Sequence, residues 1–338
     1  MSNLPKTYRR VVLVRRPPGE PAESDFRVEE VSMPEPKHGE VLVKVAYLSL
    51  DPYQRGRMRD AASYAAPIGL GEVMTGGIVG EVVKSNNPRF AVGDIVEDRL
   101  GWQEYAIGGA ATMRKVDPSL APISTANGVL GMPGMTAYFG LLEVGQPKPG
   151  ETIVVSAASG AVGQVVGQIS KIMGCRVVGT AGGQDKCDWL TRELGFDAAV
   201  DYKAGNVFRA LRSACPDGID VYFDNTGGPV LDAALALANL RGRIVCCGNV
   251  SQYDVEKPAP GPMGVPGLVV VKRLRLEGFI VMDFYDRRAE AETRLARWIA
   301  EGRLKAELDI LDGLEKAPEA LIGLFEGSNR GKRAVRVS

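Results

Sequence analysis

A short apolar run that stops abruptly at small residues constrains this chain more than any other segment. Residues 152–155 are Thr-Ile-Val-Val and residues 156–160 are Ser-Ala-Ala-Ser-Gly, after which a helical pattern of apolar residues runs from Gly163 to Met173. β-Branched residues favour a strand, and small residues allow a tight turn into a following helix. This segment therefore predicts a strand, a turn and the start of a helix.

The spacing of the small residues matches the pattern G-x-G-x-x-G of dinucleotide-binding folds, with alanine in the first glycine position. In such a turn the backbone approaches a pyrophosphate closely, and the helix N-terminus offers unpaired N–H groups to the phosphates. Glycine turns of this kind also occur without a ligand, so the neighbouring segments have to support the reading. The residues expected to form the cradle are Ala158, Gly160, Ala161, Val162 and Gly163.

The segments that follow keep the strand–helix alternation of a doubly wound sheet. In such a sheet ligands bind at the carboxyl ends of the parallel strands. The further strands are predicted at 175–180, 197–200, 219–223, 243–246 and 274–279, and the intervening helices at 184–194, 206–214 and 230–240.

The position about 20 residues past the glycines distinguishes the two nicotinamide cofactors. An acidic residue there would hold the ribose 2′-hydroxyl of NAD, but the second predicted strand ends in Gly-Thr-Ala-Gly-Gly without an acid. Lys186 follows that strand, and Tyr202 with Lys203 follows the third. Lys186 could be an ordinary solvated helix residue, yet a missing acid beside a cation suits a 2′-phosphate. We therefore expect NADP rather than NAD.

Composition excludes several classes of partner. Among 338 residues Lys plus Arg equals Asp plus Glu, at 41 each, so no overall positive field points to nucleic acid or to an anionic membrane. No apolar stretch is long enough to span a bilayer, and the N-terminal residues lack the apolar core of a signal peptide. We expect a cytoplasmic protein without a nucleic-acid or membrane partner.

The metal-ligating residue types are sparse. The five cysteines have no paired spacing, which argues against a disulfide scaffold and against a structural zinc site. The one histidine, His38, lies in a turn-like segment rich in proline and is read as a surface residue. We therefore expect chemistry without a metal and without a histidine base.

The composition changes upstream of the glycine turn, where short alternating segments are separated by Gly and Pro. This pattern predicts an irregular, largely antiparallel β-domain. Two amphipathic helices, at 290–301 and 315–325, and a final strand at 332–337 close the chain, and that strand lacks a partner in the parallel sheet. We expect a β-rich catalytic domain of residues 1–126 and 300–338, and a dinucleotide-binding domain of residues 127–299.

Over essentially its full length the chain resembles the medium-chain dehydrogenase/reductase superfamily. It is most similar to the zinc-independent branch with leukotriene B4 12-hydroxydehydrogenase/prostaglandin reductase, plant alkenal double-bond reductases and bacterial curcumin-reductase-like enzymes. Gln54 departs from the methionine common in the branch, and Thr226 from the common valine. The blocks that carry the resemblance are 50–58 (Leu-Asp-Pro-Tyr-Gln-Arg-Gly-Arg-Met), 131–138 (Gly-Met-Pro-Gly-Met-Thr-Ala-Tyr), 156–163, 222–225 (Tyr-Phe-Asp-Asn), 248–253 (Gly-Asn-Val-Ser-Gln-Tyr) and 328–332 (Ser-Asn-Arg-Gly-Lys).

The resemblance implies a Rossmann sheet with a GroES-like catalytic domain, and it assigns cofactor contacts. Lys186 and Tyr202 would contact the 2′-phosphate, and Asn225 would lie near the adenosine or pyrophosphate. Several of the implied nicotinamide contacts could instead be plain core residues, and the asparagine among them could be a turn residue. The residues implied around the nicotinamide are Met132, Thr136, Phe279, Val281 and Asn329.

The resemblance also implies the reaction, which is reduction of the C=C bond of an enal or enone. Hydride from NADPH would reach the β-carbon, and charge would build on the carbonyl oxygen. Tyr253 lies beyond the fifth predicted strand and matches a tyrosine implicated in catalysis. A phenol has an ordinary pKa of about 10, so it is protonated at neutral pH and can donate a hydrogen bond to that oxygen.

Other readings remain open. Tyr53 is assigned to substrate binding through its block, although it could equally anchor a loop of the β-domain. The partner is expected to be a small conjugated carbonyl compound, but an NADPH:quinone reductase or a non-catalytic NADPH-binding protein would share these motifs. Residues 269–276 are apolar enough for the homodimer that is usual in the family.

Overall fold

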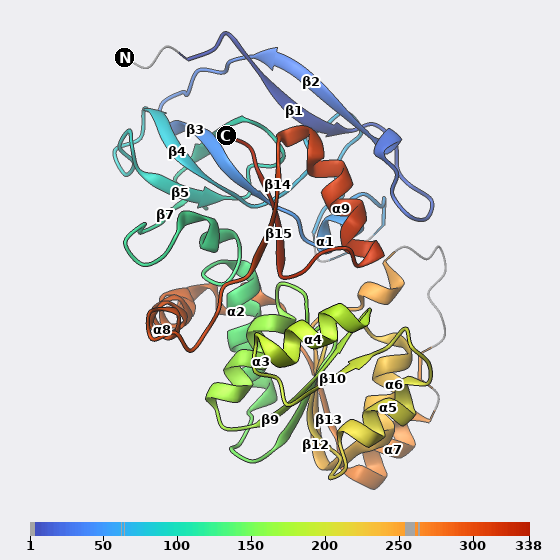
Figure 1. The fold of residues 1–338 in the computed structure, drawn as a ribbon. Helices are drawn as coiled ribbons and strands as arrows, with labels where there is room; N and C mark the ends of the chain where they lie inside the picture. Colours follow the sequence, from blue (N-terminus) through green and yellow to red (C-terminus); the bar gives the residue numbers. More distant parts are fainter. Residues whose placement is uncertain (1–3, 62, 64, 254–260, 263) are drawn as a thin grey trace. The chain divides into compact units, whose positions relative to one another are not determined.

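The computed structural model describes residues 4–61, 63, 65–253, 261–262 and 264–338. The chain forms two compact units (Figure 1). One unit comprises the residues up to Gly128 and those from Leu308 to Ser338. The other comprises Val129–Tyr253 and the described residues from Gly261 to Glu307. Each unit has its own main sheet.

The second unit is built on a six-stranded sheet in which every described pairing is parallel. The strand order is β10-β9-β8-β11-β12-β13, so the chain starts in the middle, builds outward on one side and then crosses to the other. The predicted doubly wound parallel sheet is confirmed. The strands are β8 (Thr152–Val155), β9 (Arg176–Ala181), β10 (Ala198–Asp201), β11 (Ile219–Asp224), β12 (Ala238–Cys246) and β13 (Arg275–Gly278).

Helices cover both faces of this sheet (Figure 1). The helices α3 (Gly163–Ile172) and α4 (Gln184–Arg192) pack against β8, β9 and β10 on one face. On the other face a core cluster joins alternate strand residues such as Val154 and Val178 to helices α5 (Val207–Ala214) and α6 (Gly228–Leu237). The strand β8 is buried at all four positions, as expected for a central parallel strand that is covered on both sides.

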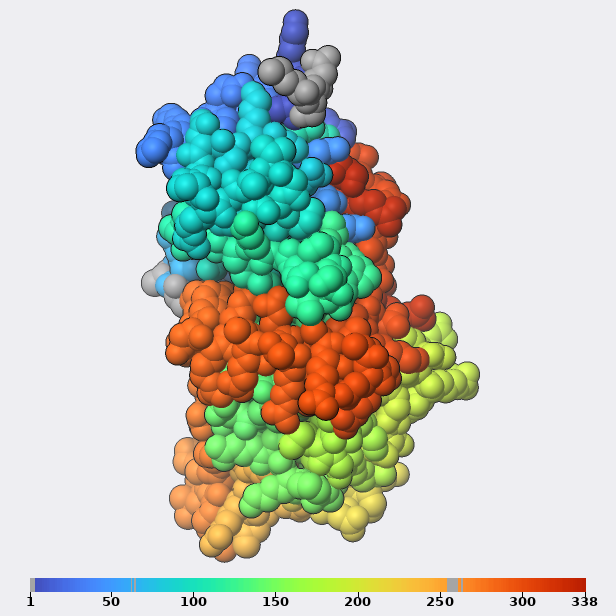
Figure 2. Space-filling model, turned by 90° about the vertical axis from the view of Figure 1, so that its left-hand side faces the viewer, coloured from blue at the N-terminus to red at the C-terminus, as the bar shows by residue number. Residues whose placement is uncertain are grey.

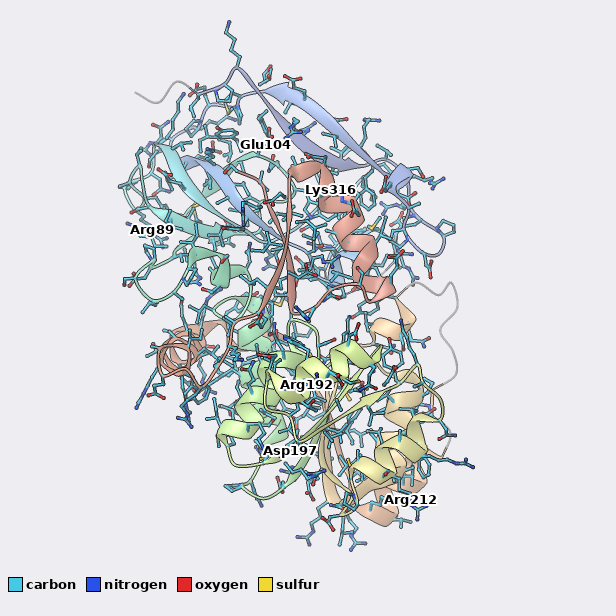
Figure 3. All side chains as sticks on the ribbon, in the orientation of Figure 1. Arg89, Glu104, Arg192, Asp197, Arg212 and Lys316 are labelled. Atoms are coloured by element: carbon cyan, nitrogen blue, oxygen red, sulfur yellow. The ribbon has the colours of Figure 1, made fainter. Side chains whose placement is uncertain are left out.

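Side-chain hydrogen bonds cap one helix of this unit and connect two other elements. Asn206 caps α5, because its side-chain oxygen accepts a hydrogen bond of 2.9 Å from the backbone N–H of Arg209. Asp197, labelled in Figure 3, accepts hydrogen bonds from the Lys171 ammonium at 2.8 Å and from the Val177 backbone N–H at 2.7 Å. That carboxylate joins the end of α3 to the start of β9.

The boundary between α6 and β12 differs from the prediction. The helix predicted at 230–240 ends at Leu237, and β12 begins directly afterwards. The Asn239 side chain donates hydrogen bonds of 3.0 Å to the Asp217 carbonyl and 2.8 Å to the Asp220 carboxylate. These long-range contacts hold the chain extended, and they override the local helical pattern.

Several elements were not anticipated from the sequence, among them two helices of this unit and a strand of the other. Helix α2 (Met132–Phe139) continues into a π-helical turn, and it packs against α3 and α8 (Arg288–Ala300). Helix α7 (Val265–Lys272) precedes β13. The strand is β14 (Leu308–Asp312). In the space-filling view of Figure 2 the α8 segment, orange in the bar, lies at the surface.

The first unit is mostly antiparallel, as the alternating segments predict. Its larger sheet has the order β14-β15-β3-β4-β5-β7, with β6 also paired to β3, and β1 and β2 form a separate pair. Helix α9 (Ala317–Glu326) contributes Ala320 and Leu321 to the core of this unit. The remaining strands are β1 (Thr7–Leu13), β2 (Phe26–Ser32), β3 (Glu40–Ser49), β4 (Ile78–Ser85), β5 (Ile95–Asp98), β6 (Tyr105–Gly109), β7 (Arg114–Lys115) and β15 (Lys332–Arg336).

The final strand returns to this unit, as its lack of a partner in the parallel sheet predicts. β15 pairs antiparallel with β3, with Ala334 opposite Ser49. A buried ion pair lies beside this pairing, because the Lys332 ammonium is 2.9 Å from the Asp51 carboxylate and both side chains are almost fully buried. The two ends of the chain are therefore joined by polar contacts inside the core of one unit.

The cysteines form no disulfide bonds in this structure. All five cysteines are free, and burial raises the pKa of the Cys247 thiol to about 12, with the nearby Asp224 charge adding to the effect. Among the described residues, no helix is both long enough and apolar enough to cross a membrane.

Candidate functional site

Backbone segments of the protein approach one another closely at the glycine turn. The Ala158 N–H donates a hydrogen bond of 2.9 Å to the Thr180 carbonyl at the end of β9, and the Gly160 N–H donates one of 2.9 Å to the Ala157 carbonyl. A Cβ atom on Gly163 would lie 2.3 Å from that Ala157 oxygen and 2.7 Å from the Ala158 Cα. Only glycine at 163 therefore lets α3 begin directly against the turn.

A polar network joins the ends of β8 and β11, the two central strands. The Asn225 N–H donates to the Ser156 hydroxyl at 2.8 Å, and the Asn225 side-chain amide donates to the Ser156 carbonyl at 2.7 Å. One oxygen of Asp224 accepts from the Tyr222 hydroxyl at 2.9 Å. The same oxygen accepts from the backbone N–H groups of Thr226 at 3.0 Å and Gly227 at 2.8 Å.

These contacts define what Asn225 and Asp224 do in the structure. Asn225, predicted as a cofactor contact, holds the segment after β11 to the turn that begins α3. Burial raises the pKa of Asp224, while the hydrogen bonds from Gly227 and Thr226 lower it. Burial also raises the pKa of Tyr222 well above its ordinary value, with the Asp224 charge as the second cause. Sequence reasoning did not single out Ser156, Asp224 or Tyr222 as a network, because no local pattern shows which strand ends are neighbours.

The end of β10 brings Tyr202 and Lys203 to the loop that follows β9. β9 ends at the buried Ala181 without an acid, and Lys186 follows in the first turn of α4. A Cβ atom on Gly182 would lie 2.9 Å from the Lys203 Cε and 3.0 Å from the Tyr202 hydroxyl. The side chains of Tyr202 and Lys203 therefore lie against the loop between β9 and α4.

Tyr253 follows a short 3₁₀ turn, Val250–Gln252, that is attached to the end of β11. The Val250 N–H donates to the Asn225 carbonyl at 3.2 Å, and the Ser251 hydroxyl donates to the Thr226 carbonyl at 2.6 Å. This places Tyr253 at the carboxyl edge of the sheet, where its position after the fifth strand predicts it.

The four nicotinamide candidates of this unit come from two packed elements. Thr136 lies one turn after Met132 in α2, and its hydroxyl donates to the Met132 carbonyl at 2.8 Å. Phe279 and Val281 follow β13, and α2 packs against the 3₁₀ segment Val281–Arg287. The Phe279 ring also meets Phe223 edge to face with a centroid distance of 6.4 Å, so it has a packing role as well.

Each of the two candidates of the first unit lies within three residues of one member of the buried ion pair in sequence. Tyr53 is the first residue of α1 (Tyr53–Arg57), which begins two residues after Asp51. Asn329 precedes β15, is 8% exposed, and donates from its side-chain amide to the Gly331 carbonyl at 2.9 Å. Asn329 thus has the turn contact that an asparagine before a glycine suggests.

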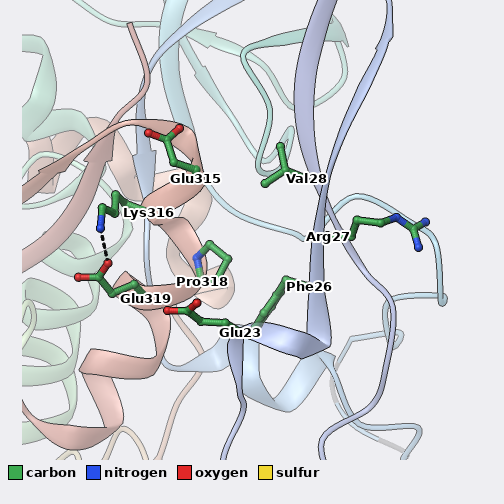
Figure 4. Close-up of a pocket in the computed structure, with 8 residues that line it drawn as sticks. All are labelled: Glu23, Phe26, Arg27, Val28, Glu315, Lys316, Pro318 and Glu319. Carbon is green, nitrogen blue, oxygen red and sulfur yellow. Dashed lines mark hydrogen bonds and ion pairs between the residues drawn. The ribbon is translucent and has the colours of Figure 1, made fainter.

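A surface hollow of about 250 Å³ lies elsewhere in the first unit, between β2 and α9 (Figure 4). None of the predicted site residues lines it. The Lys316 ammonium and the Glu319 carboxylate, 2.7 Å apart, form an ion pair at its side. The lining residues are Glu23, Phe26, Arg27, Val28, Glu315, Lys316, Pro318 and Glu319.

Comparison with known proteins covers almost the whole chain. A family model described as the N-terminal domain of oxidoreductase matches residues 9–116, and one described as zinc-binding dehydrogenase matches residues 161–301. The chain is 48% identical to the NADPH-dependent curcumin reductase of Escherichia coli, over 98% of this chain and 97% of the relative. It is 44% identical to the NADP(+)-dependent 2-alkenal reductase of Nicotiana tabacum, over 98% and 97% of the two chains.

This chain belongs to the zinc-independent branch of the medium-chain dehydrogenase/reductase family. A solved structure agrees with the assignment. The structure of CurA from Vibrio vulnificus in complex with NADPH superposes with a TM-score of 0.93 at 45% identity, and it covers 98% of this chain and 99% of its own. Although one family model carries zinc in its description, the described residues contain no cluster of three or more His, Cys, Asp or Glu side chains that could hold a metal ion.

The contact at Gly163 yields a stability prediction. We expect Gly163→Ala to lower the free energy of unfolding by about 1–3 kcal/mol, because the added Cβ overlaps the Ala157 carbonyl and overpacks the turn. Gly160→Ala is the matched control, since its Cβ would approach that oxygen only to 3.2 Å. Denaturant unfolding measures both variants, and equal losses would show that the approach at 163 is not special.

Proposed function

We propose that this protein reduces the C=C bond of α,β-unsaturated ketones and aldehydes with NADPH and without zinc. The observation that carries the proposal is the similarity, over nearly the full length of the chain, to a curcumin reductase and a 2-alkenal reductase. The enzyme is thus an NADP-dependent oxidoreductase that acts on CH–CH groups.

The chemistry of the residues proposed around the cofactor fits NADPH. The turn before α3 carries at most a methyl group at Ala158, Gly160 and Gly163, which suits a close approach of a pyrophosphate to its backbone. The end of β9 has no acid to repel a 2′-phosphate, whereas Lys186 and Tyr202 lie at or near the loop that follows it. The remaining residues that we propose as cofactor contacts are Met132, Thr136, Ala161, Val162, Asn225, Phe279, Val281 and Asn329.

When bound, NADPH supplies the hydride that reaches the β-carbon of the conjugated carbonyl compound. The protein's own contribution is to hold the developing negative charge on the carbonyl oxygen. We assign this role to the Tyr253 hydroxyl, because a phenol can donate a hydrogen bond to that oxygen, and we assign Tyr53 to substrate binding. Protonation of the α-carbon then completes the reduction.

A substrate panel tests the function. Purified protein is mixed with NADPH and either a 2-alkenal, an enone or a quinone, and the loss of absorbance at 340 nm is followed with product analysis. We expect saturated aldehydes and ketones from the alkenal and the enone. Oxidation of NADPH with quinones alone would favour a quinone reductase. Tight NADPH binding without turnover of any acceptor would contradict an enzymatic role.

The assignment of Tyr253 makes a separate prediction. Tyr253→Phe removes the proposed donor but keeps the ring, so kcat for an enone should fall at least tenfold, which corresponds to about 1.4 kcal/mol of barrier. Tyr105→Phe, a change in β6 of the first unit, is the matched control and should leave kcat unchanged. A Tyr253→Phe enzyme with the wild-type kcat would restrict this residue to packing.

We also propose a homodimer joined along β13 and a cytoplasmic location. β13 is the outermost strand of its sheet and all four of its residues are exposed, and an exposed strand edge is a template for pairing with a second chain. Val270 and Val271 in α7 are 73% and 68% exposed, which is costly for apolar side chains unless they are covered. The five free cysteines suit a reducing compartment.

The dimer is tested by light scattering after size-exclusion chromatography. The wild-type protein should have twice the chain mass, and Val270→Lys combined with Leu276→Lys should produce a monomer, because charge is introduced into the proposed interface. Val92→Lys, at an exposed valine of the first unit, is the control and should remain dimeric. A monomeric wild-type protein would contradict the proposal.

A further inference from the structure

One carboxylate oxygen connects the two loops that carry the proposed 2′-phosphate residues. Asp201 is the last residue of β10, and it lies opposite Ala181, the last residue of the neighbouring β9. Its Oδ1 accepts a hydrogen bond of 2.9 Å from the Gly183 N–H, in the loop after β9. The same oxygen accepts one of 2.9 Å from the Lys203 N–H, in the loop after β10.

This shared acceptor determines where the side chains beyond it lie. With both loops attached to Asp201, Tyr202 and Lys203 approach Gly182 so closely that a Cβ atom there would contact them at about 3 Å. Lys203 is exposed and Tyr202 is 43% exposed, so apolar burial does not account for their position. Both side chains thus remain accessible to solvent.

The strand on which Asp201 lies also bears on the choice between NAD and NADP. An acidic side chain at the end of the second strand of a dinucleotide-binding sheet would bind the ribose 2′-hydroxyl and repel a 2′-phosphate. Here the acid ends the third strand, and one of its oxygens is occupied by two backbone N–H groups. Backbone donors stabilise the negative charge of a carboxylate and direct that oxygen toward the loops.

We propose that Asp201 is a positioning residue for NADPH selectivity and that Lys203 is a second cation for the 2′-phosphate. Asp201 acts through the two loops, which it holds so that Lys203 and Tyr202 lie on one side of Gly182, with Lys186 following on α4. Lys203 contacts the phosphate directly, as a charge-assisted donor. This inference depends on the proposed function only because it assumes that the bound cofactor is NADPH.

A pair of substitutions isolates the positioning role. Asp201→Asn removes the charge but keeps a side-chain oxygen that accepts from both N–H groups, whereas Asp201→Ala removes the charge and the acceptor. The dissociation constants of NADPH, NADH and 2′,5′-ADP are measured with the full chain by calorimetry. We expect Asp201→Ala to weaken NADPH and 2′,5′-ADP at least tenfold and NADH less than threefold, and Asp201→Asn to remain within threefold of the wild type for NADPH.

A separate substitution tests Lys203. Its side chain is exposed, so its loss does not disturb the core. Lys203→Met should weaken NADPH and 2′,5′-ADP about tenfold and leave NADH unchanged. Two controls account for charge alone. Lys115→Met removes a surface cation of the first unit, and Asp185→Asn removes an exposed acid in the first turn of α4. Both controls should keep the wild-type ratio of NADPH to NADH affinity.

The outcomes separate the possibilities. Equal NADPH affinities for Asp201→Asn and Asp201→Ala would overturn the positioning role, and an unchanged affinity ratio in Lys203→Met would overturn the phosphate contact. If Asp201→Ala fails to fold, Lys203→Met and Asp201→Asn still decide, because loss of affinity in Asp201→Asn would show that charge rather than the hydrogen bonds matters. Failure of the proposed reaction is distinct, since it would appear as intact NADPH binding without reduction of enones.

Discussion

The direct packing of helix α3 against the turn before it is the contact on which the second unit depends. Because Gly163 has no side chain, the helix starts within van der Waals distance of the Ala157 carbonyl, and its N-terminal N–H groups face the carboxyl edge of the sheet. A hydrogen bond from the Ala158 N–H connects the same turn to the end of β9, and the hydrogen bonds between Asn225 and Ser156 connect it to the end of β11. A phosphate-binding turn of this kind is therefore supported by three strands, although it is formed by one segment.

The distribution of acids along this edge is the second constraint. Asp224 is buried and accepts hydrogen bonds from backbone and hydroxyl donors, so its role is to connect β11 with the turn that follows. Asp201 stands one strand away from the position that would favour NAD, and it connects two loops instead. Asp224 and Asp201 thus lie at this edge, but both accept hydrogen bonds from backbone N–H groups of the protein. This agrees with a site for a phosphorylated ribose.

The first unit relies on a different kind of contact. A buried ion pair seldom adds net stability, because removing two charges from water costs about as much as their attraction returns. The pair of Lys332 and Asp51 nevertheless specifies one arrangement, since Lys332 also donates to the Leu50 carbonyl and Asp51 accepts from the Ser49 hydroxyl. This arrangement joins the segment before Tyr53 to the segment after Asn329. The two candidates of this unit are therefore connected through its core rather than through surface loops.

Much of this architecture could be predicted from the sequence because it depends on local patterns. The β-branched run before the small residues, the alternation of strands and helices, and the missing acid after β9 are all readable over short windows, and the sheet and the family assignment agree with them. Helix α2, helix α7 and strand β14 could not be read in this way. Contacts from distant parts of the chain decide them, as they do at Asn239, where two long-range hydrogen bonds end a helix that the local pattern would extend. Likewise, the residues Ser156, Asp224 and Asp201 are unremarkable in sequence. Only the tertiary structure gave them roles, because a carboxylate can connect two loops only after the sheet has brought the ends of neighbouring strands together.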